Sequence, residues 1–348
     1  MDQAGFGIVG SRRKWVACIV IGVGALQKRP RHGFPDLVAK QTNRRPRVHV
    51  AVTGASGLIG SSLVPALTTG GHRVTRLVRG APRPGEIRWD PAGGGLESAA
   101  LGGVEGVVHL AGESIVGARW TASHLRRVLE SRRTGTRLLA EAIAAAPRVP
   151  GPRVLVSASA IGIYGDCGDR VLTEASPPGR GVLPDVAQAW EAATGPAEAA
   201  GIRVVRLRIG LLLTPAGGLL QRMLPPFRLG VGGRLGSGAQ WMSWISVDDL
   251  IGAVQHALSN ESVRGPVNAV SPEPVTNAAF TRRLGAVLHR PAFVPVPRAA
   301  LRMVFGRMAD EAILASARVL PEVLTATGYR FRHPTLEAAL AHLLGTTA

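Results

Sequence analysis

The sequence predicts an α/β protein built on a doubly wound, mostly parallel β-sheet, with a smaller C-terminal substrate and lid region. Three observations predict it. Short β-branched runs alternate with helical segments from residue 47 to about residue 210, and a glycine-rich turn follows the first run. The 348-residue chain, 46% hydrophobic, is also long enough to cover both faces of such a sheet.

The predicted elements follow in a regular order. Apolar, β-branched runs predict strands at residues 47–54, 72–79, 104–112, 153–159 and 202–210. Helical spacing of apolar residues predicts helices at residues 57–71, 121–146 and 183–200, the second opening on Thr121. Pro- and Gly-rich composition predicts connecting loops at residues 80–95 and 176–181.

After about residue 211 the alternation loosens. A helix, a glycine-rich loop and a short strand lead to an acidic turn at Asp248 and Asp249, which we interpret as structural and as the cap of the next helix. Short helices separated by prolines follow. The expected organisation is a poorly ordered basic extension (1–46), an NADP-binding domain to which some later segments return (47–210), and a smaller substrate, lid and C-terminal domain (211–348).

The formal net charge of +18 comes from 41 Lys and Arg against 23 Asp and Glu, and residues 1–47 hold ten of the basic and two of the acidic residues. A basic surface is one way to attract nucleic acid. However, no basic run is interleaved with aromatic residues, which make up 4% of the chain. We therefore expect a solvated, arginine-rich surface and no nucleic-acid partner.

Residues 15–26 follow the basic run SRRK and superficially resemble a signal peptide. The apolar stretch is about twelve residues long, too short to cross a bilayer. We expect no stable membrane span and a cytoplasmic protein; a segment lying on a membrane surface is the alternative. Cys18 and Cys167 make neither a disulfide framework nor a metal site, so no metal is expected.

A glycine pattern follows the first predicted strand. The segment VTGASGLIG places Gly54, Gly57 and Gly60 at the mouth of the first helix. In a strand–turn–helix context, the first glycine permits the turn, the second lets the backbone approach a pyrophosphate, and the third allows close helix packing. This pattern predicts a dinucleotide site; a merely tight turn is the alternative.

The end of the second strand indicates which dinucleotide binds. NAD sites place a carboxylate there for the ribose 2′-hydroxyl. Here Val78 and Arg79 occupy the position, with no Asp or Glu near them. A guanidinium suits a 2′-phosphate, so the sequence favours NADP(H). A solvated surface arginine is the alternative.

Several motifs resemble those of the extended short-chain dehydrogenase/reductase superfamily, the group that includes nucleotide-sugar epimerases. They are the glycine turn, HLAGE (109–113), SASAIGIYG (157–165) and WISVDDL (244–250). Narrower motifs resemble the epimerase-like, NADP-binding subfamily with a C-terminal domain of unknown function: WDP (89–91), LAGESI (110–115), RW (119–120), SRRTGT (131–136), GSGAQWMSWI (236–245) and GPVNAVSPEPVTN (265–277). The resemblance covers residues 47–345 and implies a Rossmann-type fold with NADP(H).

The resemblance also implies site residues. Around the pyrophosphate it places Gly54, Ser56, Gly57, Leu58, Ile59 and Gly60. It places Arg79 at the adenosine end of the cofactor, and Leu110, Ala111 and Gly112 along its length. Ser159 falls at the superfamily's catalytic hydroxyl.

The superfamily's proton carrier is absent. Its helix carries a tyrosine and, four residues on, a lysine that lowers the tyrosine pKa. Alignment on the glutamate of AWEAA puts Leu183 and Ala187 at these positions. We consider Tyr164, Glu113 or water as the substitute, although Tyr164 also suits loop packing and Glu113 also suits a turn cap. Plausible substrate-pocket residues are Arg119, Trp120, Gln240 and Trp241.

Two main hypotheses from different classes follow, with nucleic-acid binding through the basic surface as a third and weaker one. The first is an NADP(H)-dependent oxidoreductase or epimerase-like enzyme acting on a small molecule, in which Ser159 polarises a carbonyl or hydroxyl. The second is a non-catalytic NADP(H) sensor or scaffold that lacks the base. The sequence predicts neither the substrate nor the oligomeric state.

Overall fold

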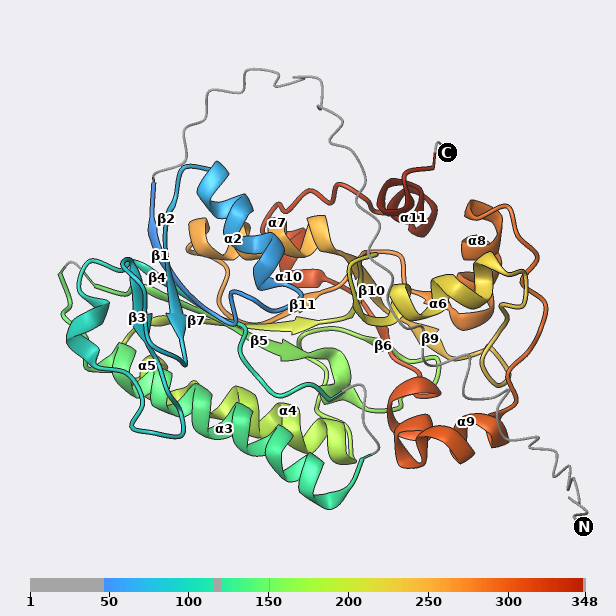
Figure 1. The fold of residues 1–348 in the computed structure, drawn as a ribbon, viewed down its shortest axis with the longest axis horizontal. Coiled ribbons are helices and arrows are strands. Elements are labelled where there is room, and N and C mark those ends of the chain that lie inside the picture. The colour runs from blue at the N-terminus through green and yellow to red at the C-terminus, as the bar shows by residue number, and fades with distance from the viewer. Residues whose placement is uncertain (1–46, 116–119, 150, 347–348) are drawn as a thin grey trace, which may run out of the picture.

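A seven-stranded, all-parallel sheet forms the centre of the protein (Figure 1). The computed structural model describes residues 47–346 apart from 116–119 and 150. The strand order is β11-β7-β5-β4-β1-β2-β3. The strands are β1 (His49–Thr53), β2 (Arg73–Val78), β3 (Glu86–Arg88), β4 (Gly106–His109), β5 (Val154–Ala160), β7 (Arg203–Ile209) and β11 (Gly265–Ala269). The predicted fold class is confirmed.

The strand order reverses at the centre of the sheet. β1 pairs with β2 on one side and with β4 on the other, and Thr53 at the end of β1 lies opposite His109 at the end of β4. The connection that leaves β1 therefore runs toward one edge of the sheet, and the connection that leaves β4 runs toward the other edge. The resulting crevice at the carboxyl ends of the strands is where open α/β sheets bind ligands.

Helices cover both faces of the sheet (Figure 1). On one face lie α2 (Gly60–Thr69), α7 (Val247–Ser259) and α10 (Glu322–Ala326); on the other lie α3 (Ala122–Ala144), α4 (Val182–Ala192) and α5 (Gly195–Ala199). Val50 of β1 packs on the face covered by α2, α7 and α10, and its neighbour Ala51 packs on the face covered by α3 and α5. This alternation is what a strand buried on both faces requires.

Two predicted boundaries were wrong. The helix expected at residues 183–200 is divided into α4 and α5 around Thr194. Pro196, which has no N–H to donate, sits in the first turn of the new helix, where it is tolerated. The segment 80–95, expected to be a loop, contains β3. This three-residue edge strand is too short to show a periodic pattern.

The C-terminal part of the chain forms a third apolar cluster beside the sheet. Its elements are α6 (Gly218–Arg228), β9 (Trp241–Met242), β10 (Trp244–Ser246), β12 (Val275–Thr276), α8 (Asn277–Val287) and α11 (Leu336–Leu344). Trp244 and Phe280 are its largest fully buried side chains. The other strands and α-helix of the described residues are β6 (Val171–Leu172), β8 (Leu211–Leu213), α9 (Arg298–Phe305) and β13 (Arg318–Val319). Short 3-10 helices lie at Ser98–Leu101 and Ile161–Tyr164, and a π-helical turn at Ala309–Ile313.

The two aspartates in the first turn of α7 make different contacts. Ser246 is the N-cap, since its hydroxyl accepts the Asp249 N–H at 3.0 Å and donates to the Asp249 carboxylate at 2.8 Å. The expectation that the aspartates cap the helix was therefore wrong in this detail. Asp249 is buried, whereas Asp248 points outward to His342.

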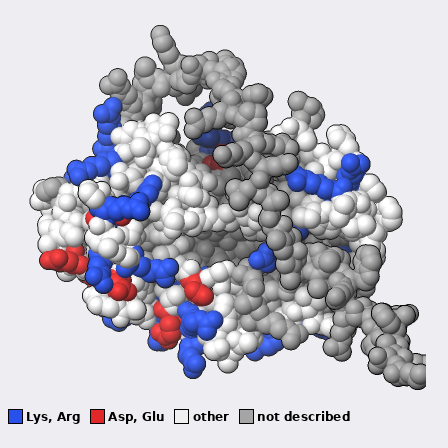
Figure 2. All heavy atoms as spheres, in the orientation of Figure 1, with Lys and Arg blue, Asp and Glu red and all other residues white. Residues whose placement is uncertain are grey.

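Basic side chains lie at several separate places on the face drawn in Figure 2, and acidic side chains stand among some of them. On this face the positive charge does not gather into one patch. No helix of the described residues is long and apolar enough to cross a membrane. The extension expected over residues 1–46 lies outside the described residues.

Candidate functional site

The glycine turn between β1 and α2 has no room for side chains at two positions. A Cβ on Gly60 would lie 2.2 Å from the Gly54 carbonyl oxygen and 2.7 Å from the Ala55 Cα. Gly54 has a φ of +66°, and a Cβ there would lie 2.9 Å from the Ala111 backbone nitrogen. The turn therefore brings backbone against backbone, as a cradle for a pyrophosphate requires.

The rest of the predicted cofactor surface is accessible. Ser56 and Gly57 are exposed, Leu58 and Ile59 are half-buried, and α2 has no acidic residue in its first turn. Its positive N-terminal end therefore carries no local carboxylate to compete with a phosphate. Arg79 is exposed directly after β2.

A buried polar network holds the loop after β4 against the glycine turn. Thr53 Oγ1 accepts the N–H groups of Leu110 and Ala111 at 3.1 and 3.2 Å, which leaves its hydrogen to donate to His109 Nδ1 at 2.7 Å. His109 Nε2 contacts the Thr136 hydroxyl of α3 at 3.0 Å. Burial, together with Arg132, lowers the pKa of His109 to about 4, so this ring is neutral at pH 7. Gly112, next along, is exposed.

Three polar side chains form a row across the carboxyl ends of the neighbouring strands. Ser159 of β5 lies opposite Arg208 of β7, which lies opposite Asn268 of β11. Residues paired in this way point to the same face of a sheet. Glu191 of α4 lies over the row: its carboxylate accepts the Ser159 hydroxyl at 2.7 Å and the Arg208 guanidinium at 2.8 and 2.9 Å.

The ion pair between Glu191 and Arg208 is almost completely buried. Their side chains are 11% and 8% exposed. Burial alone would lower the pKa of Arg208, but hydrogen bonds and charge interactions with Glu191 and Tyr164 raise it above the ordinary value. The guanidinium is therefore permanently charged and anchors the carboxylate that receives the Ser159 hydrogen.

The structure places Tyr164 within the same network but inside the core. The side chain is fully buried, and its hydroxyl donates to Asn268 Oδ1 at 2.7 Å and approaches the Thr173 carbonyl oxygen at 3.0 Å. The hydroxyl also accepts a hydrogen bond from Arg208 Nη1 at 2.9 Å. Burial raises the pKa of this tyrosine. These contacts favour a positioning role for Tyr164 over proton transfer.

The helix positions of the missing tyrosine and lysine carry packing residues. A Cβ on Gly162 would lie 3.3 Å from the Leu183 side chain, so this leucine covers the turn after β5. Ala187 is buried in the same small apolar cluster as Tyr164. Neither side chain carries a titratable group.

Glu113 lies on the exposed loop after β4. Its backbone N–H donates to the Ser131 hydroxyl at 3.0 Å, and its carbonyl accepts from Arg132 at 2.8 Å. Arg132 also stacks on Trp190, 4.7 Å from the ring centroid, and burial lowers its pKa to about 10. The backbone of Glu113 is thus fixed by α3, while its carboxylate is left at the surface.

The predicted substrate residues occupy different positions. Trp120 is half-buried and donates to the Ile115 carbonyl at 3.1 Å, whereas Arg119 lies outside the described residues. Gln240 is buried and donates to the Leu235 carbonyl. Trp241 donates to Asp169 and lies under Arg318, 4.3 Å from the ring centroid. Within the described parts of the chain, the side chains of Trp120, Gln240 and Trp241 make no hydrogen bond to Ser159.

The family assignment rests on two sequence matches. A family model described as the NAD dependent epimerase/dehydratase family matches residues 50–269, well over half of the chain. The chain belongs to this family. A second match, a domain of unknown function (DUF1731), covers residues 296–343 of this epimerase-family protein. The resemblance inferred from the motifs is confirmed.

Curated and solved relatives extend the match over most of the chain. Epimerase family protein Mb2239 of Mycobacterium bovis is 44% identical over 294 residues, 84% of this chain and 96% of that protein. The crystal structure of human epimerase family protein SDR39U1 (isoform 2), obtained with NADPH, is 37% identical with a TM-score of 0.78, covering 86% of this chain and all of that one. A nucleoside-diphosphate sugar epimerase from Corynebacterium glutamicum is 38% identical with a TM-score of 0.71, covering 86% and 59% of the two chains.

Sequence reasoning missed the partners of Ser159. These partners are Glu191, which the sequence analysis used only to align the helix, and Arg208, for which it predicted no role. A signal was present, because Arg206 and Arg208 interrupt an apolar strand expected to be buried on both faces. A buried arginine requires a carboxylate partner. Its identity, however, depends on how α4 packs on the sheet, which the sequence pattern does not specify.

Proposed function

We propose that this epimerase-family protein binds NADPH across the carboxyl ends of β1, β2 and β4. The observation that carries the proposal is the turn from Gly54 to Gly60, which admits no Cβ at either end and opens at the point where the strand order reverses. The NADPH present in the crystal structure of the human relative supports the same choice of cofactor.

Each part of the cofactor has a proposed partner. The amide groups of Ser56, Leu58 and Ile59 and the N-terminal end of α2 take the pyrophosphate, since the Gly57 amide already donates to the Gly54 carbonyl at 2.9 Å. The exposed Arg79 takes the 2′-phosphate. Leu110 and Ala111, held by Thr53, and the exposed Gly112 lie along the cofactor. In this proposal residues 47–210, completed by β11 and α7, form the cofactor-binding domain, and the rest of residues 211–348 contributes to the substrate region.

The proposed activity is an oxidoreductase or epimerase-like reaction on a small molecule, a sugar nucleotide or a carbonyl compound. NADPH supplies a hydride when it is bound. The hydrogen of Ser159 is directed to Glu191, so Oγ is oriented to accept a hydrogen bond from a substrate hydroxyl. To polarise the carbonyl of a substrate that NADPH reduces, the Ser159 hydroxyl has to turn its hydrogen from Glu191 to the carbonyl oxygen. With Tyr164 buried, Glu113 or water is the proposed proton carrier. Arg119, Trp120, Gln240 and Trp241 remain proposed substrate contacts.

A second candidate function is a non-catalytic NADPH sensor. Two observations favour it. Leu183 and Ala187 occupy the positions where the tyrosine and lysine are expected, and the buried hydroxyl of Tyr164 already contacts Asn268, Thr173 and Arg208. Such a protein keeps the cofactor site and loses the proton carrier. Both candidates bind NADPH, and they differ in turnover.

The two candidates are separated by following NADPH absorbance with a panel of carbonyl compounds and nucleotide sugars. The enzyme predicts one of two results: NADPH oxidation by at least one carbonyl compound, or an epimerised product from a nucleotide sugar without net NADPH consumption, because an epimerase returns the hydride it removes. Either activity is expected to be mostly lost in Ser159→Ala. Tight NADPH binding with no oxidation or epimerised product across the panel would favour the sensor. Absence of NADPH binding would contradict both.

A further inference from the structure

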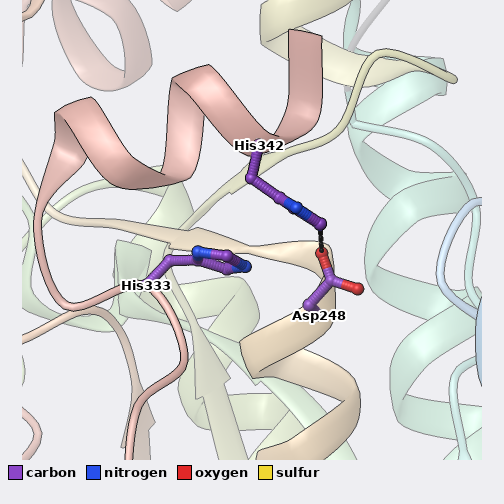
Figure 3. A group of neighbouring side chains, drawn as sticks. All are labelled: Asp248, His333 and His342. Atoms are coloured by element: carbon purple, nitrogen blue, oxygen red, sulfur yellow. Dashed lines mark ion pairs between the residues drawn. The ribbon is translucent and has the colours of Figure 1, made fainter. Parts of the chain in front are cut away.

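Three side chains of metal-ligating types meet at the protein surface, at the start of α7 and around α11. Asp248 lies in the first turn of α7, His333 precedes α11, and His342 lies in α11 (Figure 3). One carboxylate oxygen and one nitrogen of each imidazole all lie within 4.8 Å of one another. His342 Nε2 is 3.2 Å from Asp248 Oδ2, and the two imidazole rings stack with centroids 4.4 Å apart.

The neighbouring aspartate fixes the backbone that carries one of these ligands. Asp249, buried and held by Ser246, accepts the backbone N–H groups of Arg332 and His333 at 2.7 and 3.1 Å. It also accepts the Tyr329 hydroxyl at 3.1 Å. These hydrogen bonds fix the segment before α11 to the start of α7. The backbone of His333 is therefore held near Asp248 by the buried Asp249.

The donor set is that of a borderline transition metal. Two imidazoles and one carboxylate, with water in the fourth position, bind Zn²⁺ in tetrahedral geometry, whereas Mg²⁺ and Ca²⁺ prefer oxygen ligands. Metal–ligand bonds of about 2.0–2.1 Å hold tetrahedral ligand atoms roughly 3.3 Å apart. His342 and Asp248 already have this separation, and the His342 side chain is 53% exposed, so it has space to turn.

We propose that Asp248, His333 and His342 form a Zn²⁺ site. The ion joins the start of α7 to α11, and thus links the region matched by the epimerase/dehydratase family to the region matched by the domain of unknown function. Its ligands come from two elements, so the bound ion would hold the C-terminal helix on the sheet domain while the fourth position stays open to water. The site is independent of the proposed cofactor chemistry.

The test uses the untagged, full-length protein after treatment with a chelator. Competition against a chromophoric zinc indicator is expected to show one tight site per chain, and Zn²⁺ is expected to raise the melting temperature as its concentration increases. Mg²⁺ at the same concentrations is expected to leave the melting temperature unchanged. His342→Gln and Asp248→Asn are each expected to weaken Zn²⁺ binding at least tenfold.

His289→Asn is the matched control, because it removes an exposed imidazole that is not a member of this group and asparagine tolerates the backbone φ of +51°. It is expected to bind Zn²⁺ like the wild type. Circular dichroism establishes that each variant is folded. Unchanged zinc affinity in the folded His342→Gln and Asp248→Asn variants would overturn the proposal, as would anomalous zinc scattering from a crystal at another position.

Discussion

Replacing Gly60 with alanine is expected to weaken NADPH binding at least about tenfold and to lower the melting temperature. The added Cβ would lie 2.2 Å from the Gly54 carbonyl oxygen. Because the clash is with backbone, no side chain can rotate to relieve it, and the turn and the N-terminus of α2 must move apart. Overpacking of this kind costs about 1–3 kcal/mol, and about 1.4 kcal/mol corresponds to a tenfold change in affinity.

Gly80→Ala is the matched control. It introduces the same methyl group just after β2, where nothing lies within 4 Å of the added Cβ. NADPH titration by fluorescence is performed on both variants, with thermal melting to confirm that each is folded. Wild-type affinity in a folded Gly60→Ala protein would show that the turn does not hold the pyrophosphate.

Glu191→Gln is expected to reduce the free energy of unfolding by about 3–5 kcal/mol, the usual cost of leaving one charge of a buried pair without its partner. The substitution keeps the size of the side chain but leaves the buried guanidinium of Arg208 without a counter-charge. The hydroxyl of Ser159 loses its carboxylate acceptor at the same time. Urea-induced unfolding measures the change.

Two comparisons isolate the effect of burial. Glu141→Gln breaks a surface pair with Arg137, whose side chains are about half exposed, and is expected to cost less than about 1 kcal/mol. The double variant Glu191→Gln with Arg208→Met removes both buried charges and is expected to recover part of the lost stability. Equal losses for Glu191→Gln and Glu141→Gln would contradict the account of this network.

Local patterns were sufficient to predict the sheet and the glycine turn. The β-branched runs identified five of the seven sheet strands, and Thr121 was correctly expected at the start of α3, where its side chain accepts the His124 N–H. β3 and β11 were not predicted as strands. β3 is three residues long, and β11 contains Gly and Pro, so neither shows a period of two.

Local sequence patterns could not predict the hydrogen-bond network around Ser159. Its members come from β5, α4, β7 and β11, and they meet only because of the strand order and the register of the sheet. The burial of Tyr164 has the same origin: its position after Ser159 suggests a loop near the cofactor, but the turn after β5 directs it into the core. The cluster of Asp248 with two histidines likewise requires residues 85 or more positions apart to meet.

The central claim, that this protein binds NADPH through the turn and Arg79, is tested most directly by titrating the purified wild type with NADPH and with NADH under the same conditions. We predict at least tenfold tighter binding of NADPH, and a loss of most of that preference in Arg79→Gln, because the guanidinium pairs with the 2′-phosphate. Equal affinity of the wild type for the two cofactors would contradict the claim.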